Sequence, residues 1–163
     1  MNHPERPGFN KSVRKLLAKE VAKTVHQHTG KPNSYEELES DLFDLFCDQY
    51  HCREDGYEIA KSLDSSYGYS PNAQFVEALD CTSSLYSGII DQQSKEWVLA
   101  YNVNMPLAIG DKVKFPYFRG SIEGEITRLF PNEAKYGIWS ETLGLDKKET
   151  SYHLVEFEKV EKL

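Results

Sequence analysis

The sequence lacks a long apolar run and lacks the cysteine pattern of a disulfide-bonded domain. No segment of the 163 residues approaches the ~18 apolar residues of a transmembrane helix. The segment MNHPERPGF has no apolar core of a secretion signal. Cys47, Cys52 and Cys81 are an odd number without framework spacing. We therefore predict a cytoplasmic protein that contacts no membrane and folds without disulfides.

Signatures of catalysis and of metal binding are also missing. The chain contains no G-x-S-x-G, phosphate loop, H-E-x-x-H or dinucleotide fingerprint. Cys47 and His51 share a helical face and Cys52 adjoins them, but no C-x-x-C or H-x₃-H pair completes a four-ligand zinc site. Cys81 has no histidine partner that can be placed beside it. The sequence thus predicts a protein that is not an enzyme and holds no metal or cofactor.

A positive net charge is confined to the first 31 residues. Residues 1–31 carry a net charge of +5, residues 32–100 carry −11 and residues 101–163 carry −1, which gives −7 for the chain. Such a balance disfavours binding to nucleic acid or to an anionic membrane at the level of the whole chain.

The apolar pattern changes period once along the chain. Before about residue 104 apolar residues recur at the helical spacing, and after residue 110 they alternate as in strands. Hydrophobic residues make up 39% and charged residues 28%, values typical of globular proteins. We predict an α+β fold with a helical domain at 1–104 and a small β domain at 105–163.

About four helices are expected in the first domain. Asn10 caps a helix over 11–28, Ser34 begins a second with Glu37 three residues on, and Asp55 caps a third that ends at 67. Ser70 and Pro71 begin a fourth. Apolar spacing favours one continuous helix from 71 to 101, with a break near Asp91 left open.

The predicted second helix carries an acidic edge, which we define as Glu37, Asp41, Asp44 and Asp48. One interpretation is a solvated face that neutralises the lysines of the first helix. The other is a docking surface for a basic partner, such as a protein that normally grips DNA. Both remain open on the sequence.

The segment at 57–79 superficially suggests a helix-turn-helix. Its connection is too long for that motif, and the helix that would enter the major groove contains Glu77 and Asp80 but no Lys or Arg. A recognition helix needs cations for phosphates and donors for base edges. Ordinary helix packing is the preferred interpretation.

The last third reads as five short strands, which suit a small closed barrel. GDKVKF, a glycine turn, EGEITRL and a closing VEFEKV resemble the SH3-like barrels of the KOW and Tudor type over about residues 107–163. Glu123 and Glu125 stand where KOW segments carry lysines, so nucleic-acid binding is not the expectation. The whole chain, in the arrangement DGYEIAKSL…FVEALD…W…NVNMPLAIGDKV, is similar to short uncharacterised proteins of bacteriophages and prophages.

The β domain holds more aromatic residues than its core can bury. Val113, Phe115, Ile126, Ile138, Val155 and Phe157 would fill the core and leave a surplus near Arg119: Tyr117, Phe118, Tyr136, Trp139 and Tyr152. An exposed aromatic cluster beside an arginine has the composition of a protein-interface hot spot. Packing of these rings against the helical domain is the competing interpretation.

The sequence therefore favours a non-catalytic interaction protein, encoded by a phage or mobile element, that binds another protein. Inhibition of a host nucleic-acid-binding defence system is a special case that the acidic edge would suit. The alternative hypothesis is a nucleic-acid-associated regulator that binds through the barrel with Lys112, Lys114, Arg119 and Arg128.

Overall fold

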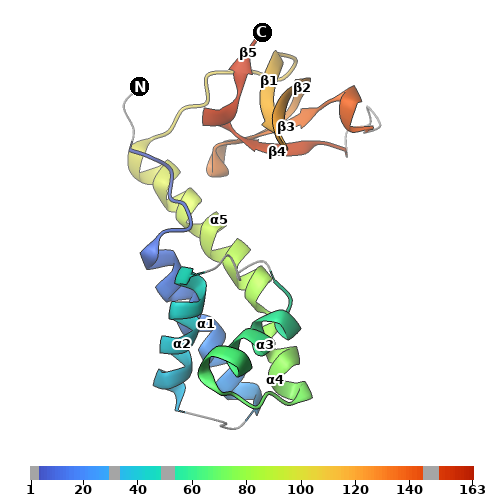
Figure 1. The fold of residues 1–163 in the computed structure, drawn as a ribbon. Helices are drawn as coiled ribbons and strands as arrows, with labels where there is room; N and C mark the ends of the chain where they lie inside the picture. The colour runs from blue at the N-terminus through green and yellow to red at the C-terminus, as the bar shows by residue number, and fades with distance from the viewer. Residues whose placement is uncertain (1–3, 30–33, 49–53, 145–150) are drawn as a thin grey trace. The chain divides into compact units, whose positions relative to one another are not determined.

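A computed structural model describes residues 4–29, 34–48, 54–144 and 151–163. The chain forms two compact units: Pro7–Gln93, and Ser94–Leu163 together with the described residues of Met1–Arg6 (Figure 1). Helices precede a five-stranded antiparallel sheet, so the predicted α+β class is confirmed. The two units meet between Gln93 and Ser94, inside a helix, whereas the sequence predicts a domain boundary at 104/105. Limited proteolysis tests the predicted boundary.

The first three helices begin where their capping residues predicted. They are α1 (Lys11–Thr29), α2 (Tyr35–Asp48) and α3 (Gly56–Tyr67). In each, the side chain of the capping residue accepts a hydrogen bond from a first-turn amide, which satisfies a donor that the helix leaves unpaired. The donor–acceptor pairs are Val13 N to Asn10 Oδ1 at 3.1 Å, Glu37 N to Ser34 Oγ at 3.1 Å, and Glu58 N to Asp55 Oδ1 at 3.0 Å.

The expected continuous helix over 71–101 is wrong. It is divided into α4 (Ala73–Leu79) and α5 (Thr82–Tyr101), and α4 is capped by Asn72 rather than Ser70. At the break, the Asp80 carboxylate accepts a hydrogen bond from Gly56 N at 2.8 Å, and Thr82 Oγ1 donates to Leu79 O at 2.7 Å. The Thr82 bond is a local side-chain bond that competes with a continuous helical ladder, and the Asp80 bond ties the break to the start of α3. From Thr82, α5 runs uninterrupted through Asp91.

The helices of the Pro7–Gln93 unit enclose one apolar core. Its buried members come from α1 to α4 and include the predicted stripe of α2: Leu38, Leu42, Leu45 and Phe46. On α1 the helical spacing predicts that Leu16 and His28 belong to the buried stripe, but Leu16 is 40% exposed and His28 lies in solvent.

The second unit contains a five-stranded sheet in the order β4-β3-β2-β1-β5. The strands are β1 (Lys112–Tyr117), β2 (Gly120–Phe130), β3 (Lys135–Trp139), β4 (His153–Glu156) and β5 (Glu161–Lys162). No pairing joins β4 to β5 in the described part of the chain, so the expectation of a closed barrel is wrong. The two-residue β5 is too short to complete the ring of strands.

Gly124 lies at a close contact between β2 and β3. A glycine inside a strand predicts a bend or a bulge, but the irregular register of the β2–β3 pair falls between Ile126 and Arg128 instead. A Cβ at position 124 would lie 2.5 Å from Trp139 O and 2.6 Å from Ile138 Cγ2. The glycine is therefore needed for the close approach of two strands.

The sheet is curved around a small core of its own. Its buried residues are Val113, Phe115, Ile126, Tyr136, Ile138 and Val155. This set agrees with the predicted core except that Tyr136 takes the place of Phe157, which is only partly buried. The ring of His153 on β4 contacts Phe115 on β1 at a centroid distance of 6.0 Å, although β2 and β3 separate these strands in the sheet.

Candidate protein-binding site

The turn between β1 and β2 exposes the most solvent-accessible large apolar side chain of the described residues. Tyr117 pairs with Gly120, so Phe118 and Arg119 form a two-residue hairpin loop. We name Tyr117, Phe118 and Arg119 the hairpin tip. Phe118 is 92% exposed and has a φ of 48°, in the left-handed region that tight hairpin loops usually reserve for glycine or asparagine.

An aromatic row leads from the hairpin tip to β4. The rings of Phe118 and Tyr117 meet edge to face at 4.5 Å, and Tyr117 meets His153 edge to face at 5.7 Å. His153 in turn lies over Phe115. Sequence reasoning missed His153, although its spacing of two from the buried Val155 places both on the inner face of β4. The row holds Tyr117 in place beneath the exposed Phe118.

Two residues predicted to belong to the exposed aromatic cluster, Tyr136 and Trp139, do not lie at the hairpin tip. The prediction that Tyr136 is exposed is wrong: its side chain is fully buried, and its hydroxyl accepts a hydrogen bond from Leu107 N at 2.9 Å. Burial raises the pKa of this phenol. Trp139 is half-buried opposite Glu125, which is five residues along β2 from Gly120 and therefore about 17 Å from the end of the strand that adjoins the hairpin loop. Trp139 and Phe118 thus do not share one patch.

The acidic edge on α2 is only partly a free surface. Glu37 and Asp44 are exposed, whereas Asp41 accepts a hydrogen bond from Tyr69 Oη at 2.9 Å and joins α2 to the segment after α3. The side chain of Asp48 lies outside the described residues. Two lysines of α1 face a different part of α2, in a groove of about 470 Å³ whose lining residues are Lys11, Lys15, Glu36, Glu39, Ser40 and Phe43.

Several cations of the sheet have local partners. Lys112 pairs with Glu125 at 2.6 Å across β1 and β2, and Arg128 lies 5.2 Å over the ring of Tyr152. Lys114 and Arg119 are exposed. The basic side chains named for the nucleic-acid alternative are therefore not gathered into one uncompensated patch.

Of the three residues weighed and rejected as zinc ligands in the sequence, His51 and Cys52 lie outside the described residues, and Cys47 lies half-buried on α2. Within residues that the structure describes, no group of three or more His, Cys, Asp or Glu side chains is arranged to hold a metal ion. Cys81 is half-buried, and burial raises the pKa of its thiol. None of the described helices is both long and apolar enough to cross a membrane.

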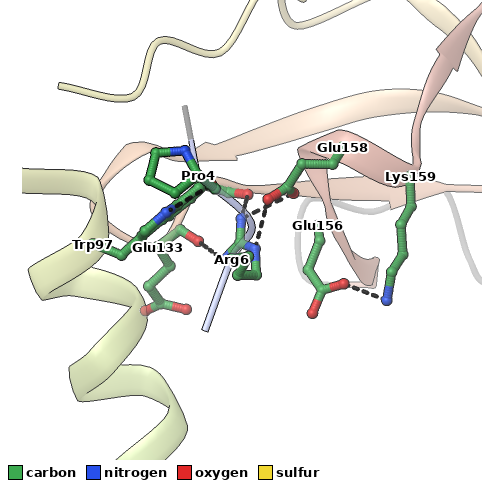
Figure 2. Close-up of polar contacts among 8 residues, drawn as sticks. Pro4, Arg6, Trp97, Glu133, Glu156, Glu158 and Lys159 are labelled. Atoms are coloured by element: carbon green, nitrogen blue, oxygen red, sulfur yellow. Dashed lines mark hydrogen bonds and ion pairs between the residues drawn. The ribbon is translucent and has the colours of Figure 1, made fainter. Parts of the chain in front are cut away.

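Arg6, near the N-terminus, joins distant parts of the second unit through a set of contacts that we name the Arg6 clasp (Figure 2). Arg6 makes a two-point ion pair with Glu158, through Nε at 2.9 Å and Nη2 at 3.1 Å. The same guanidinium donates to Glu133 O at 2.8 Å and Ala134 O at 2.7 Å, and it stacks 4.9 Å from the ring of Trp97. The Trp97 indole donates to Pro4 O at 3.1 Å. Trp97 is buried against this N-terminal segment.

The chain was compared with family models, curated proteins and solved structures. None of them matches. The function is therefore inferred from the geometry of the site.

Proposed function

We propose that this protein is a non-catalytic, cytoplasmic interaction protein and that the hairpin tip is its contact surface for another protein. The supporting observation is Phe118, a bulky apolar side chain that is 92% exposed on a backbone with positive φ. A non-glycine residue in such a conformation costs about 1–3 kcal/mol, and within the described residues the exposed ring offsets only part of this cost, through its edge-to-face contact with Tyr117. Binding free energy gained from contact with a partner would explain why position 118 holds phenylalanine.

The surroundings of Phe118 suit a binding hot spot. Aromatic residues and arginine carry much of the binding energy at protein interfaces, and Tyr117 and Arg119 flank the exposed ring. The turn is held by six register pairs between β1 and β2, and Tyr117 is fixed by His153. A loop that is already ordered loses little entropy when it binds.

The acidic edge should contribute less to the binding of a partner than the hairpin tip does. Exposed charge pairs contribute about 0–1 kcal/mol each, and Asp41 is already engaged by Tyr69. Its remaining exposed carboxylates, Glu37 and Asp44, would steer a basic partner rather than anchor it. Inhibition of a phage host's nucleic-acid-binding protein is the narrower form of the proposal, and it rests on this edge together with the resemblance to phage proteins.

Capture of a partner from cell lysate, with nuclease present, tests the proposal. Phe118→Ala is expected to weaken capture by about thirtyfold, which corresponds to a ~2 kcal/mol hot spot. Leu99→Ala is the matched control, because Leu99 is 80% exposed on α5 and lies outside the site. Equal capture by wild type and Phe118→Ala would contradict the proposal.

Phe118→Gly separates binding from folding. Glycine adopts positive φ without strain, so this variant is expected to be at least as stable as Phe118→Ala, in which the strain persists. Loss of capture in Phe118→Gly with unchanged or higher stability would show that the ring is kept for binding. Restored capture in this variant would mean that the partner reads the backbone of the turn instead.

A further inference from the structure

The groove between α1 and α2 carries opposite charges on its two helices. Both helices belong to the Pro7–Gln93 unit, and the groove has a volume of about 470 Å³. Its side chains from α1 are both lysines, and its charged side chains from α2 are both glutamates. The complete lining is Lys11, Lys15, Glu36, Glu39, Ser40 and Phe43. In each helix these residues are spaced so that they share one face.

The positive and negative charges also lie at opposite ends of the groove. Tyr35 Oη, at the start of α2, donates to Lys19 O of α1 at 3.3 Å. Arg14 Nη1, nearer the start of α1, donates to Cys47 O near the end of α2 at 3.4 Å. The two helices therefore run antiparallel. Because the lysines belong to the first turns of α1 and the glutamates to the first turns of α2, the groove has a positive end and a negative end.

The lysines at the positive end have no carboxylate partner among the described residues. The lysines of α1 form one ion pair there, Lys23 with Glu20 at 3.7 Å, which lies farther along the helix. Lys11 and Lys15 are exposed, and the first turn of α1 contains no acidic residue. Cations near a helix N-terminus are unfavourable, because the helix dipole is positive at that end. Interactions within α1 therefore do not explain why these two positions hold lysine.

The negative end of the groove is likewise not neutralised. In the part of the chain that the structure describes, Glu36 and Glu39 form no ion pair, although lysines line the same groove. Burial raises the pKa of the neighbouring Tyr35 phenol, and the hydrogen bond to Glu39 with the charges of Glu39, Glu20 and Glu36 raises it further. A phenol whose pKa is raised by nearby carboxylates lies in a negative potential. Both ends of the groove thus keep charge that a partner can use.

A groove with two ends of opposite charge is complementary to a copy of itself. A two-fold axis that crosses the groove between its ends places the positive end of one copy against the negative end of the other, and makes this contact twice. The half-buried ring of Phe43 and the apolar stems of the lysines add contact area. A partner with charge of one sign would be repelled by one end of the groove, whereas a second copy is attracted by both.

We propose that the protein forms a two-fold symmetric homodimer through the groove between α1 and α2, in which the groove lysines of each copy pair with the groove glutamates of the other. The charges are mostly exposed, so the dimer is weak and dissociates as the salt concentration rises. The contact is independent of the hairpin tip, which belongs to the other unit.

Sedimentation velocity of the full chain, from micromolar to millimolar concentration, tests the proposal. Wild type should shift from monomer towards dimer at low salt and less so at high salt. The all-negative variant is Lys11→Glu with Lys15→Glu, and the all-positive variant is Glu36→Lys with Glu39→Lys. Each alone should self-associate at least about tenfold more weakly than wild type, because like charges then face each other across the two-fold axis.

A mixture of the two variants provides the sharpest test. Every contact between an all-negative and an all-positive chain again joins opposite charges, so the equimolar mixture should form a heterodimer at least as tightly as wild type forms its homodimer. This recovery would also show that both variants are folded. Glu37→Lys with Asp44→Lys is the matched control, since it makes the same change in net charge on the same helix but outside the groove. The control should self-associate like wild type.

Each contrary result overturns the homodimer. These results are a wild type that stays monomeric at millimolar concentration, undiminished self-association of either groove variant, or a mixture that does not associate. If wild type is monomeric and Lys11→Glu with Lys15→Glu loses capture of the partner, the groove binds the partner and not a second copy. The effect of Phe118→Ala on capture tests the hairpin tip separately, so the proposed function can stand when the homodimer falls.

Discussion

Arg6 and Glu158 are 152 residues apart in the chain and form a two-point ion pair, with N–O distances of 2.9 and 3.1 Å. Side-chain exposure is only 10% for Arg6 and 27% for Glu158. Ala134 O accepts from both Arg6 and Phe157 N, so these contacts join the start of β3 to the end of β4. Glu158 belongs to the short helix η4 (Phe157–Lys159), which directly follows β4.

Removal of the clasp should destabilise the sheet unit. Arg6→Ala leaves Glu158 and two carbonyls without their donor, and we expect the free energy of unfolding of this unit to fall by about 3 kcal/mol. Both tryptophans of the chain, Trp97 and Trp139, lie in this unit. Urea unfolding followed by tryptophan fluorescence therefore measures the effect.

Arg6→Lys is the control for charge. A lysine ammonium cannot reproduce the planar fork that serves a carboxylate and two carbonyls, so it should recover only a small part of the loss. Full recovery by lysine would show that charge alone, rather than the hydrogen-bond geometry, stabilises the unit.

The segment between α5 and β1 should be the first site of limited proteolysis. Asn104, Pro106 and Ala108 are exposed and belong to no helix or strand, so cleavage is expected between residues 102 and 108. The two fragments should stay associated on gel filtration, because Arg6 on the first contacts Glu158 on the second. They should separate in Arg6→Ala. Initial cleavage within 82–100 would contradict the description of α5.

Gly124→Ala should destabilise the sheet unit by about 1–3 kcal/mol, because the new methyl group meets the Trp139 carbonyl, which cannot move without distorting β3. Gly120→Ala is the matched control in the same strand, since a Cβ there meets nothing within 4 Å. Urea midpoints that shift equally for the two variants would refute the close-contact explanation.

Asp111 should contribute stability that depends on pH. A hydrogen bond from Ala108 N at 2.9 Å, and then the bond from Lys162 Nζ at 2.7 Å, lower the pKa of this carboxyl. A carboxyl whose pKa is lowered on folding stabilises above its ordinary pKa of about 3.9, and the effect is lost as pH falls through the folded value. Asp111→Asn should thus lower the urea midpoint at neutral pH and converge with wild type in acid. A difference that persists unchanged below about pH 3 would exclude this ionisation as the cause.

Local signals in the sequence predicted much of the fold. Asn10, Ser34 and Asp55 cap the helices expected of them, because capping depends on a few neighbouring residues. The core of the sheet followed from period-two alternation. The division of the last helix depended on Asp80 bonding to Gly56, a contact between residues 24 apart that apolar spacing does not report.

The candidate site was harder to predict for the same reason. Tyr117, Phe118 and Arg119 could be placed together because they are consecutive. The exposure predicted for Tyr136 is wrong because its hydroxyl accepts a hydrogen bond from the distant Leu107 N, which allows the ring to be buried. Trp139 lies away from the hairpin tip because the strand register places it opposite Glu125. The Arg6 clasp and the position of β4 at the edge of the sheet depend on contacts between distant segments, which sequence periodicity does not report.

The dissociation rate of the captured partner tests the central claim most directly. It should be measured for wild type, for Phe118→Ala and for the double variant Glu37→Lys with Asp44→Lys, at low and at high salt. We predict that Phe118→Ala raises the dissociation rate about thirtyfold at either salt concentration, and that the charge-reversed variant leaves this rate unchanged. An unchanged rate for Phe118→Ala, together with loss of binding in the charge-reversed variant, would contradict the account and assign the contact to the acidic edge.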